Sequence, residues 1–510
     1  MRLNLGEIAM TLGSAPVYCD TSSGLLCATG QDQKSPAPSP KAAPSSSDSK
    51  LEHYRWADLV PTGAQIDSRK IQPGNLFFCL PGEHVDGHDF AVDAAKAGAV
   101  AIVASRNPWR GKAADIVGLP PVFLVDDMRC ALACVAKRHR DTSQARVIGI
   151  TGTAGKTTVK EVLAQVLEMR GRTERNPLNL NNQIGLPVSM LNASTDAAFW
   201  VMEAGISEDG DMEELGRILR PDVAIILNVG DGHVSGLGEL GVAAHKARLI
   251  DFIQPGGVAV ISTDYPDLNR QVDERQSALS RRGIELLRFS HLVDNVYARA
   301  AYTGPGGNYK VWAKDLSFEV DTPFRGDFGS ENVAAIVAVA VKLGLSREEL
   351  RQGFASARLP EQRFRVERYP RCTLLDDSYN ANPLSSSRML QAARSMADEY
   401  GQSLLLVMGE MLELGPKAES AHETLGENMA AVRPEMVFWR GGQVDALARG
   451  LRKGGYSGKL YPLSGAQEFD ALLEEIDLDN VLVLFKGSRS NKLERLVAVF
   501  REKVSPTGEK

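Results

Sequence analysis

The stretch GITGTAGKTT at 149–158 constrains what this chain can fold into more than any other feature. It follows the apolar run VIGI at 147–150. Apolar residues at the spacing of one helical face come after it: Val159, Val162, Leu163, Val166 and Leu167. A strand, a glycine-rich turn and a helix in this order point backbone N–H groups and the positive helix end at one place, which suits a phosphate. The sequence therefore predicts a nucleotide-phosphate site.

The turn offers backbone and side-chain ligands for ATP. We assign to it the following residues: Gly152, Thr153, Ala154, Gly155, Lys156, Thr157 and Thr158. Lys156 would bring a positive charge to the β- and γ-phosphates, and Thr157 would give a hydroxyl ligand to Mg²⁺. The turn departs from the strict pattern G-x-x-x-x-G-K-[ST], because Ile150 stands where the first glycine is expected. A plain strand-to-helix turn with a surface lysine is the alternative, and the surrounding sequence favours the nucleotide.

Three further apolar runs, at 199–205, 223–230 and 257–262, indicate parallel strands that are covered on both faces. Glu203 and Asn228 lie towards the C-terminal ends of the first two runs, and His233 follows the second, at the sheet edge where ligands of α/β proteins bind. Glu203 is a candidate Mg²⁺ ligand, because that cation prefers oxygen donors. Each of these side chains alone would more often be a helix cap or a loop residue. Their position next to the phosphate turn favours a role in the site.

The length of 510 residues exceeds what one hydrophobic core organises, and we predict three α/β domains. The first is a small domain at 1–143, within which the Pro/Ser/Ala-rich segment 31–50 is a flexible insertion. The second, at 144–358, is an ATP-binding domain of the P-loop type with a mostly parallel sheet. The third, at 359–510, repeats the α/β pattern and is predicted to be Rossmann-like.

Composition and charge exclude several classes of protein. The net charge of -6 argues against a general nucleic-acid binder, which needs a broad basic face. No uncharged apolar stretch of about 18 residues is present, so we expect no membrane span. The six cysteines are scattered and form no C-x-x-C pair, which favours reduced thiols in the cytoplasm. We expect a cytoplasmic monomer that acts on small molecules.

Several stretches together, spread over nearly the whole chain, resemble the Mur ligases, the ATP-dependent amide-forming enzymes of peptidoglycan precursor synthesis. They are IDSRKIQPGNLFFCLPGEHVDGHDF, TGTAGKTT, NLNNQIGLP, HVSGLG, LLDDSYNANP, VMGEMLELG and FKGSRS. Within that family the chain looks most like the member that adds D-alanyl-D-alanine to UDP-N-acetylmuramoyl-tripeptide. The DDSYNANP and GEMLELG stretches are the most specific to that member.

The resemblance implies roles for further residues around ATP and magnesium. It implies that Glu203 and His233 organise Mg²⁺ together with Thr157. It also implies a second set of nucleotide contacts: Asn332 at the adenine, Arg363 at the γ-phosphate, and Asp377 and Asn382 from the third domain. Lys246 aligns with the lysine that these ligases carbamoylate, which would add an anionic group near the metal. The implied catalytic groups are therefore Lys156, His233, Lys246 and Arg363.

The resemblance also implies where the two other substrates bind. The uridine-nucleotide end would contact Asp67, Ser68, Arg69, Asp86, Gly87 and His88. The peptide end would lie towards Asn181 and Asn182, and the carboxylate of the amino substrate towards Lys486, Ser488 and Arg489. In this mechanism the peptide carboxylate attacks the γ-phosphate to give an acyl phosphate, and the amine then displaces phosphate.

One departure from the family and two alternatives bear on this reading. Related ligases usually have G-x-H-N-x-x-N, whereas this chain has Phe328 and Gly329 in place of the His-Asn pair. One alternative is a related ligase, either another Mur ligase or one like folylpolyglutamate synthase. The other, of a different class, is a binding protein that hydrolyses ATP slowly as a switch and performs no ligation.

Overall fold

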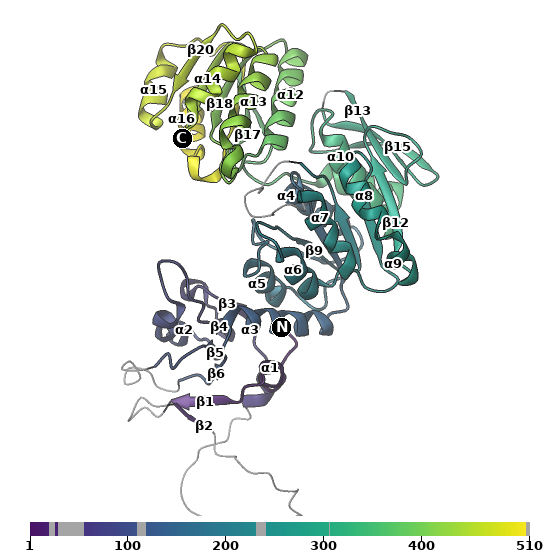
Figure 1. The fold of residues 1–510 in the computed structure, drawn as a ribbon, viewed down its shortest axis with the longest axis vertical. Helices are drawn as coiled ribbons and strands as arrows, with labels where there is room; N and C mark the ends of the chain where they lie inside the picture. Colours follow the sequence, from purple (N-terminus) through teal and green to yellow (C-terminus); the bar gives the residue numbers. More distant parts are fainter. Residues whose placement is uncertain (20–25, 29–55, 110–118, 231–240, 305, 506–510) are drawn as a thin grey trace, which may run out of the picture. The chain divides into compact units, whose positions relative to one another are not determined.

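The computed structural model describes residues 1–19, 26–28, 56–109, 119–230, 241–304 and 306–505 (Figure 1). The chain divides into two compact units, which we treat separately. The first consists of Met1–Ala145, Leu180–Ala197 and Arg217–Leu219, and the second of Arg146–Asn179, Ala198–Gly216 and Arg220–Lys510. The predicted insertion at 31–50 and the candidate ligand His233 lie outside the described residues.

The first unit contains a six-stranded sheet in the order β2-β1-β6-β5-β4-β3. Its strands are β1 (Pro16–Cys19), β2 (Leu26–Ala28), β3 (Gly63–Gln65), β4 (Asn75–Phe78), β5 (Ala101–Ala104) and β6 (Val122–Leu124). The strands from β3 to β6 pair in parallel, and β1 pairs antiparallel with β2 and β6. The helices are α1 (Leu5–Leu12), α2 (Ala91–Lys96), α3 (Met128–Thr142) and α5 (Gly185–Asn192), with short 3-10 helices η2 (Ser68–Lys70) and η3 (Gly87–Phe90).

Helix α5 lies within the sequence range predicted for the central domain but belongs to the first compact unit. The Asn192 side chain at its end accepts from the Ala64 backbone N–H at 3.2 Å and donates to the Ala64 carbonyl at 2.8 Å. His139 of α3 also reaches this segment, with Nε2 placed 3.2 Å from the Ala193 carbonyl oxygen. These contacts between distant parts of the sequence tie the segment to β3 and α3.

The second unit begins with a nine-stranded sheet in the order β15-β14-β13-β12-β11-β10-β7-β9-β8. Its strands are β7 (Arg146–Thr151), β8 (Thr173–Arg175), β9 (Phe199–Glu203), β10 (Val223–Ile226), β11 (Val258–Ser262), β12 (Glu285–Ser290), β13 (Ala298–Gly304), β14 (Asn308–Ala313) and β15 (Leu316–Asp321). Every pairing from β8 to β13 is parallel, and only β13, β14 and β15 pair antiparallel. The prediction of a mostly parallel central sheet is confirmed.

Several helices accompany this sheet, and the sequence pattern identified the apolar face of the first of them. They are α4 (Lys156–Leu167), α6 (Asp211–Leu219), α7 (Gly241–Ala247), α8 (Pro266–Asp273), α9 (Gln276–Arg281), α10 (Gly329–Lys342) and α11 (Arg347–Ser356). The apolar face predicted at 159–167 is fully buried in the core. Helix α10 is apolar nearly all round and buried from Gly329 to Ala340, as expected for a helix in the interior of a large protein.

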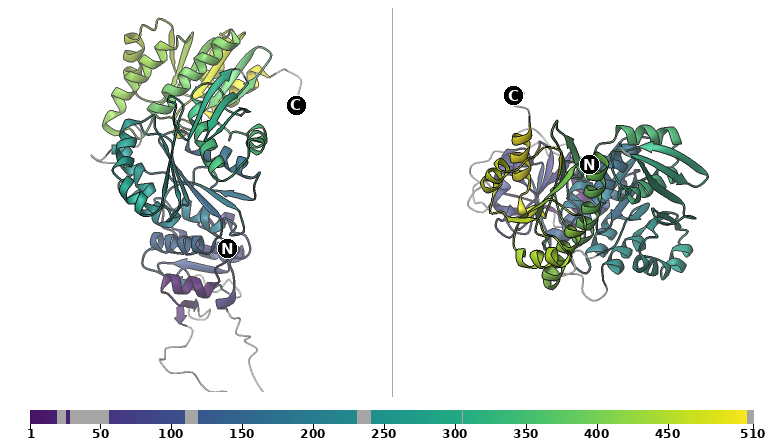
Figure 2. Two further views of the ribbon diagram at one scale, coloured as in Figure 1. Left: turned by 90° about the vertical axis from the view of Figure 1, so that its right-hand side faces the viewer. Right: turned by 90° about the horizontal axis from the view of Figure 1, so that it is seen from above.

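The C-terminal part has its own six-stranded sheet in the order β16-β17-β21-β18-β19-β20. Its strands are β16 (Arg365–Arg368), β17 (Cys372–Asp377), β18 (Ser403–Gly409), β19 (Met436–Arg440), β20 (Lys459–Pro462) and β21 (Val481–Lys486). The helices are α12 (Pro383–Tyr400), α13 (Ala418–Ala431), α14 (Val444–Lys453), α15 (Ala466–Glu474) and α16 (Glu494–Val504). Apart from the antiparallel edge strand β16 the sheet is parallel, and helices cover both faces (Figure 2).

The three sheets agree with the predicted architecture of three α/β domains. The exact domain boundaries at 143 and 358 stay a proposal. None of the helices in the described ranges combines the length and the apolar character that crossing a bilayer requires.

We predict that the close approach of α13 and α14 is needed for the stability of the C-terminal part. A Cβ atom on Gly450 would lie 1.9 Å from the Glu423 carbonyl oxygen, so Gly450→Ala must push the two helices apart. We expect a loss of about 2 kcal/mol or more in the free energy of unfolding, measured by urea denaturation. Gly465→Ala is the control, because no atom lies within 4 Å of its added Cβ. Equal stability of the two variants would contradict the prediction.

Candidate active site

The phosphate turn lies between β7 and α4 and is held by the side chain of Asn228. Its Oδ1 accepts from the Ala154 N–H at 2.8 Å, and its Nδ2 donates to the Ala154 carbonyl at 3.1 Å. Gly155 precedes α4 with φ of 80°, a left-handed conformation that favours glycine. A Cβ there would also lie 2.7 Å from Asn332 Oδ1. The turn is therefore fixed by its neighbours, as a preformed anion site requires.

Lys156, the first residue of α4, folds back over the turn. Its Nζ donates to the carbonyl oxygens of Gly152 at 2.9 Å and Thr153 at 3.4 Å. Burial lowers the pKa of Lys156, the carboxylate of Glu203 partly opposes this, and the positive charge of Arg363 lowers it further. The negative charge of a bound phosphate would stabilise the protonated form of Lys156 and so raise its pKa.

Thr157 and Glu203 meet at the base of the turn, where a cation would bind between protein and phosphates. The Thr157 hydroxyl donates to Glu203 Oε2 at 2.7 Å, and Glu203 is only 1% exposed. Asn176 fixes the Glu203 backbone, accepting from its N–H at 2.8 Å and donating to its carbonyl at 3.2 Å. A hydroxyl beside a buried carboxylate is a donor set that suits Mg²⁺.

Lys246 on α7 lies in the same neighbourhood and is 2% exposed. Burial lowers the pKa of Lys246 well below its ordinary value, the charge of Lys156 lowers it further, and Glu203 opposes only in part. This shift of the pKa favours the neutral, nucleophilic form of the amine. That state is the one that reacts with carbon dioxide.

Residues of the C-terminal part approach the turn from another side. Asn382 caps α12 and donates through Nδ2 to the Thr153 carbonyl at 3.2 Å. The guanidinium group of Arg363 lies 4.1 Å from the ring centre of Tyr379, and that of Arg489 lies 5.4 Å from it. The sequence analysis did not select Tyr379, although this aromatic residue lies between two assigned positions, Asp377 and Asn382.

The three residues assigned to the amino substrate differ in what they can still bind. Lys486 Nζ contacts Asp377 Oδ2 at 2.6 Å, and the lysine side chain is 2% exposed. Ser488 is buried, and its hydroxyl accepts from the Leu412 N–H at 3.0 Å. Arg489 keeps a side chain that is 58% exposed. Arg489 is therefore the cation most available to a carboxylate, and Asp377 and Lys486 balance each other's charge.

In the first unit, the residues assigned to the uridine nucleotide fall into two groups. Asp67 caps η2, which contains Ser68, and binds the exposed Arg69 through two hydrogen bonds of 2.9 Å. Hydrogen bonds from Arg69 lower the pKa of Asp67 despite partial burial. This pair is accessible to a ligand.

Asp86, Gly87 and His88 form the second group and are largely engaged inside the protein. His88 Nδ1 contacts Asp86 Oδ1 at 2.6 Å, and its Nε2 accepts from the Ser105 N–H at 3.0 Å. A Cβ on Gly87 would lie 2.7 Å from the Leu80 backbone. These three residues therefore shape the loop, and any contact with a nucleotide stays a prediction.

Asn181 and Asn182, assigned to the peptide, precede α5. Asn182 Oδ1 accepts from the N–H groups of Gly185 at 2.8 Å and Ile184 at 3.3 Å, so its side chain is engaged at the start of this helix. Both side chains lie in the first compact unit.

The structure explains the absence of the usual His-Asn pair. Gly329 has no room for a side chain, because an added Cβ would lie 2.3 Å from the Tyr309 hydroxyl. Phe328 packs against Phe364, with ring centres 4.7 Å apart. Asn332, the remaining family position, is 7% exposed, and its Oδ1 has no hydrogen-bond partner within the described ranges. An unpaired buried oxygen beside the phosphate turn fits a ligand contact.

Comparison with known proteins finds similarity in all three parts of the chain. Three family models match: the "Mur ligase family, catalytic domain" at 61–140, the "Mur ligase middle domain" at 150–340 and the "Mur ligase, glutamate ligase domain" at 362–489. A ligase of Escherichia coli (strain K12), named UDP-N-acetylmuramoyl-tripeptide--D-alanyl-D-alanine ligase, is 32% identical over 88% of this chain and 95% of its own length.

Two solved structures share the fold. MurF from Acinetobacter baumannii matches with a TM-score of 0.74 and 28% identity, over 86% of this chain and 93% of its own. MurF ligase from Thermotoga maritima, solved in complex with ADP, matches with a TM-score of 0.71 and 27% identity, over 88% of this chain and 99% of its own.

We predict that the Tyr379 ring orients Arg363 for a nucleotide. Tyr379→Leu removes the aromatic face and should weaken ATP binding by about threefold to tenfold, the range of a partly desolvated cation–π contact. Tyr379→Phe keeps the face and should bind ATP within about twofold of the original protein. Isothermal titration calorimetry measures both constants. Equal losses in the two variants would show that the ring face is not what matters.

Proposed function

This chain belongs to the Mur ligase family, and we propose that it adds D-alanyl-D-alanine to UDP-N-acetylmuramoyl-tripeptide at the expense of ATP. The products are UDP-N-acetylmuramoyl-pentapeptide, ADP and phosphate. One structural observation carries the proposal: the phosphate turn, the Thr157–Glu203 pair and the buried Lys246 meet at one edge of the central sheet. The match to ligases of this activity over most of the chain supports the choice of substrates.

The chemistry needs activation of a carboxylate, because a free carboxylate is a poor acyl donor. A carboxylate oxygen of the tripeptide attacks the γ-phosphorus, the bond to the β-phosphate breaks, and ADP leaves. The amine of D-alanyl-D-alanine attacks the acyl carbon, loses a proton to His233 or to phosphate, and expels phosphate. Lys156 and Arg363 stabilise the charge that develops on the transferring group, so the protein acts mainly by positioning and electrostatics.

Mg²⁺ would be held by Thr157 and Glu203, with His233 as the further ligand that the family resemblance implies. Bound there, the cation supplies positive charge to the phosphate oxygens. Lys246 would contribute after carbamoylation, in which its neutral nitrogen attacks carbon dioxide, forms an N–C bond and releases a proton. This converts a buried amine into a carboxylate beside the metal position.

The other assigned residues would each bind a part of the three substrates. Asn332 would face the adenine, and Asn382 and Asp377 would hold the nucleotide from the C-terminal domain. Arg489 would bind the carboxylate of the dipeptide, and Asp67 with Arg69 the uridine nucleotide. Because one chain carries every assigned group, we propose a monomer, and its nucleotide-linked substrates favour a cytoplasmic location.

The first prediction of this proposal concerns products. Incubation with ATP, Mg²⁺, the UDP-linked tripeptide and D-alanyl-D-alanine should give the pentapeptide, detected by mass spectrometry. Diaminopimelate and lysine are each tested as the third residue of the tripeptide.

Lys156→Met should lower turnover by about a hundredfold or more, because a positioned charge at the phosphates is lost. Lys342→Met is the control, since this lysine pairs with Glu285 away from the turn. If the rate of phosphate release did not depend on D-alanyl-D-alanine, the protein would instead be a switch that hydrolyses ATP without ligation.

The second prediction concerns Lys246. In buffer with ¹³C-bicarbonate, the protein should show a carbamate signal by ¹³C NMR that Lys246→Ala lacks. The variant should lose activity by about tenfold or more, as expected when a group that tunes a metal site is removed. A short added carboxylic acid should restore part of the rate, and bicarbonate alone should not. A fully active variant would contradict the assignment of this lysine.

A further inference from the structure

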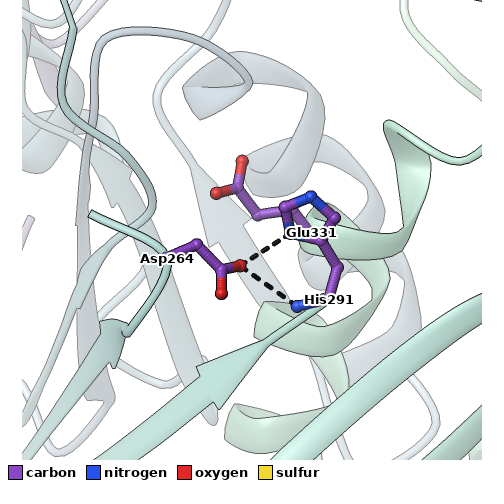
Figure 3. A group of neighbouring side chains, drawn as sticks. All are labelled: Asp264, His291 and Glu331. Atoms are coloured by element: carbon purple, nitrogen blue, oxygen red, sulfur yellow. Dashed lines mark hydrogen bonds and ion pairs between the residues drawn. The ribbon is translucent and has the colours of Figure 1, made fainter. Parts of the chain in front are cut away.

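Three ionisable side chains gather where β11, β12 and α10 come together in the second unit (Figure 3). Asp264 follows β11, His291 follows β12, and Glu331 lies in the first turn of α10. One polar atom from each residue lies within 4.8 Å of those of the other two. Asp264 Oδ2 accepts from the His291 N–H at 3.1 Å and contacts His291 Nδ1 at 2.6 Å. The mechanism above uses none of the three.

The cluster has the ligand types of a metal site, but its charges are already matched within the protein. Arg388 of α12 donates through Nη1 to Glu331 Oε2 at 2.7 Å. Burial alone would lower the pKa of His291, yet the hydrogen bond to Asp264 and the charges of Glu331 and Asp264 raise it. The Arg388 guanidinium and the His291 ring thus already face the two carboxylates, and the arginine charge disfavours an additional cation beside Glu331.

Glu331 also connects Arg388 with the phosphate turn. Its Oε2 accepts from Asn228 Nδ2 at 2.9 Å, and Asn228 in turn binds Ala154 through both its oxygen and its nitrogen. A continuous series of hydrogen bonds therefore runs from α12 through Glu331 and Asn228 to the turn. A second contact from the same region, Asn382 to the Thr153 carbonyl, reaches the adjacent residue of the turn.

The burial of Glu331 makes this series sensitive to its partner. Glu331 is 1% exposed, and the Arg388 side chain is 20% exposed. A buried carboxylate that loses its cation is strongly unfavourable and must reorient or take up a proton. Either change would disturb the hydrogen bond that Glu331 accepts from Asn228.

We propose that Glu331 and Arg388 are positioning residues for nucleotide binding, which hold the Asn228 amide and through it the phosphate turn in place. Because Arg388 comes from α12, the turn reaches its binding geometry when this helix is docked. The affinity for ATP is then coupled to the position of the C-terminal domain. This inference rests on the proposed function, since it takes the turn to bind ATP.

The first experiment compares two arginines of the same helix. Arg388→Met should raise the dissociation constant for ADP and the KM for ATP by about tenfold or more, the usual effect of losing a hydrogen bond between charged groups. The KM for the UDP-linked substrate should stay unchanged. Arg394→Met is the matched control, because Arg394 pairs at 2.7 Å with Asp398 of its own helix. Its nucleotide affinity should stay within about twofold of the original protein.

Thermal unfolding separates positioning from simple destabilisation. If both arginine variants unfold at similar temperatures and only Arg388→Met loses nucleotide affinity, the positioning role is supported. If the two lose affinity in parallel with stability, the role is merely structural and the inference fails. Arg388→Lys, which keeps the charge, should recover part of the affinity.

The second experiment is a double-mutant cycle on ADP binding. The double variant Glu331→Gln with Arg388→Met has no lone buried carboxylate, so it should bind ADP more tightly than Arg388→Met alone. Additive effects would show that the two residues do not act through each other. Uptake of one Mn²⁺ without nucleotide that is abolished by Glu331→Gln would instead make the cluster a metal site and overturn the inference. Failure of the original protein to bind ADP would contradict the proposed function itself.

Discussion

The arrangement of the site depends on the hydrogen bonds that the amide side chain of Asn228 makes to the phosphate turn. A turn that binds phosphate must present N–H groups outward, and this leaves its own backbone without the bonds of regular structure. Asn228 supplies two of them, accepting from the Ala154 N–H and donating to the Ala154 carbonyl oxygen. Since Asn228 follows a buried parallel strand, the sheet itself determines where the turn lies. Lys156 and Thr157 then take their places as the first residues of α4.

The electrostatics of the site are unbalanced in a way that suits its ligands. Burial lowers the pKa of both Lys156 and Lys246, the charge of Lys156 lowers that of Lys246 further, and Glu203 is the acid that opposes both shifts. Buried groups that lack their counter-charge shift their pKa towards the neutral form. A triphosphate would favour the charged form of Lys156, while a neutral Lys246 is open to carbamoylation. One environment thus shifts the pKa of both lysines in the same direction, and a bound triphosphate would act on Lys156, the residue of the turn.

The sequence predicted the parts of the site that local patterns encode. The strand, the turn and α4 follow from apolar spacing and glycine placement, and the meeting of Thr157 with Glu203 follows from the shared edge of parallel strands. Contacts across the chain were not predictable in this way. Nothing near Lys486 in the sequence shows that Asp377 neutralises it, and the two residues are 109 positions apart.

The same limit applies to the loop at Asp86 and to Glu331. Sequence patterns identify which side chains can bind a ligand, but not which of them already use their polar atoms in hydrogen bonds within the protein. His88 uses both ring nitrogens within the fold. Nothing in the sequence around Glu331 indicates that Arg388 and Asn228 both bind its carboxylate. The replacement of the His-Asn pair is explained only by Tyr309, whose hydroxyl occupies the space beside Gly329 and donates to the Gly326 carbonyl at 2.6 Å.

Two of the contacts between the central and C-terminal parts differ in how strictly they depend on orientation. The Phe328–Phe364 ring pair is worth about 1 kcal/mol and is not strictly directional, so it tolerates some change of orientation. The Arg388–Glu331 pair has directional hydrogen bonds and a buried charge, so it is satisfied in one orientation only. The aromatic pair can therefore keep the two parts adjacent while the ion pair defines when they are docked. A chain that has lost the His-Asn pair thus retains a way to connect domain position with the nucleotide site.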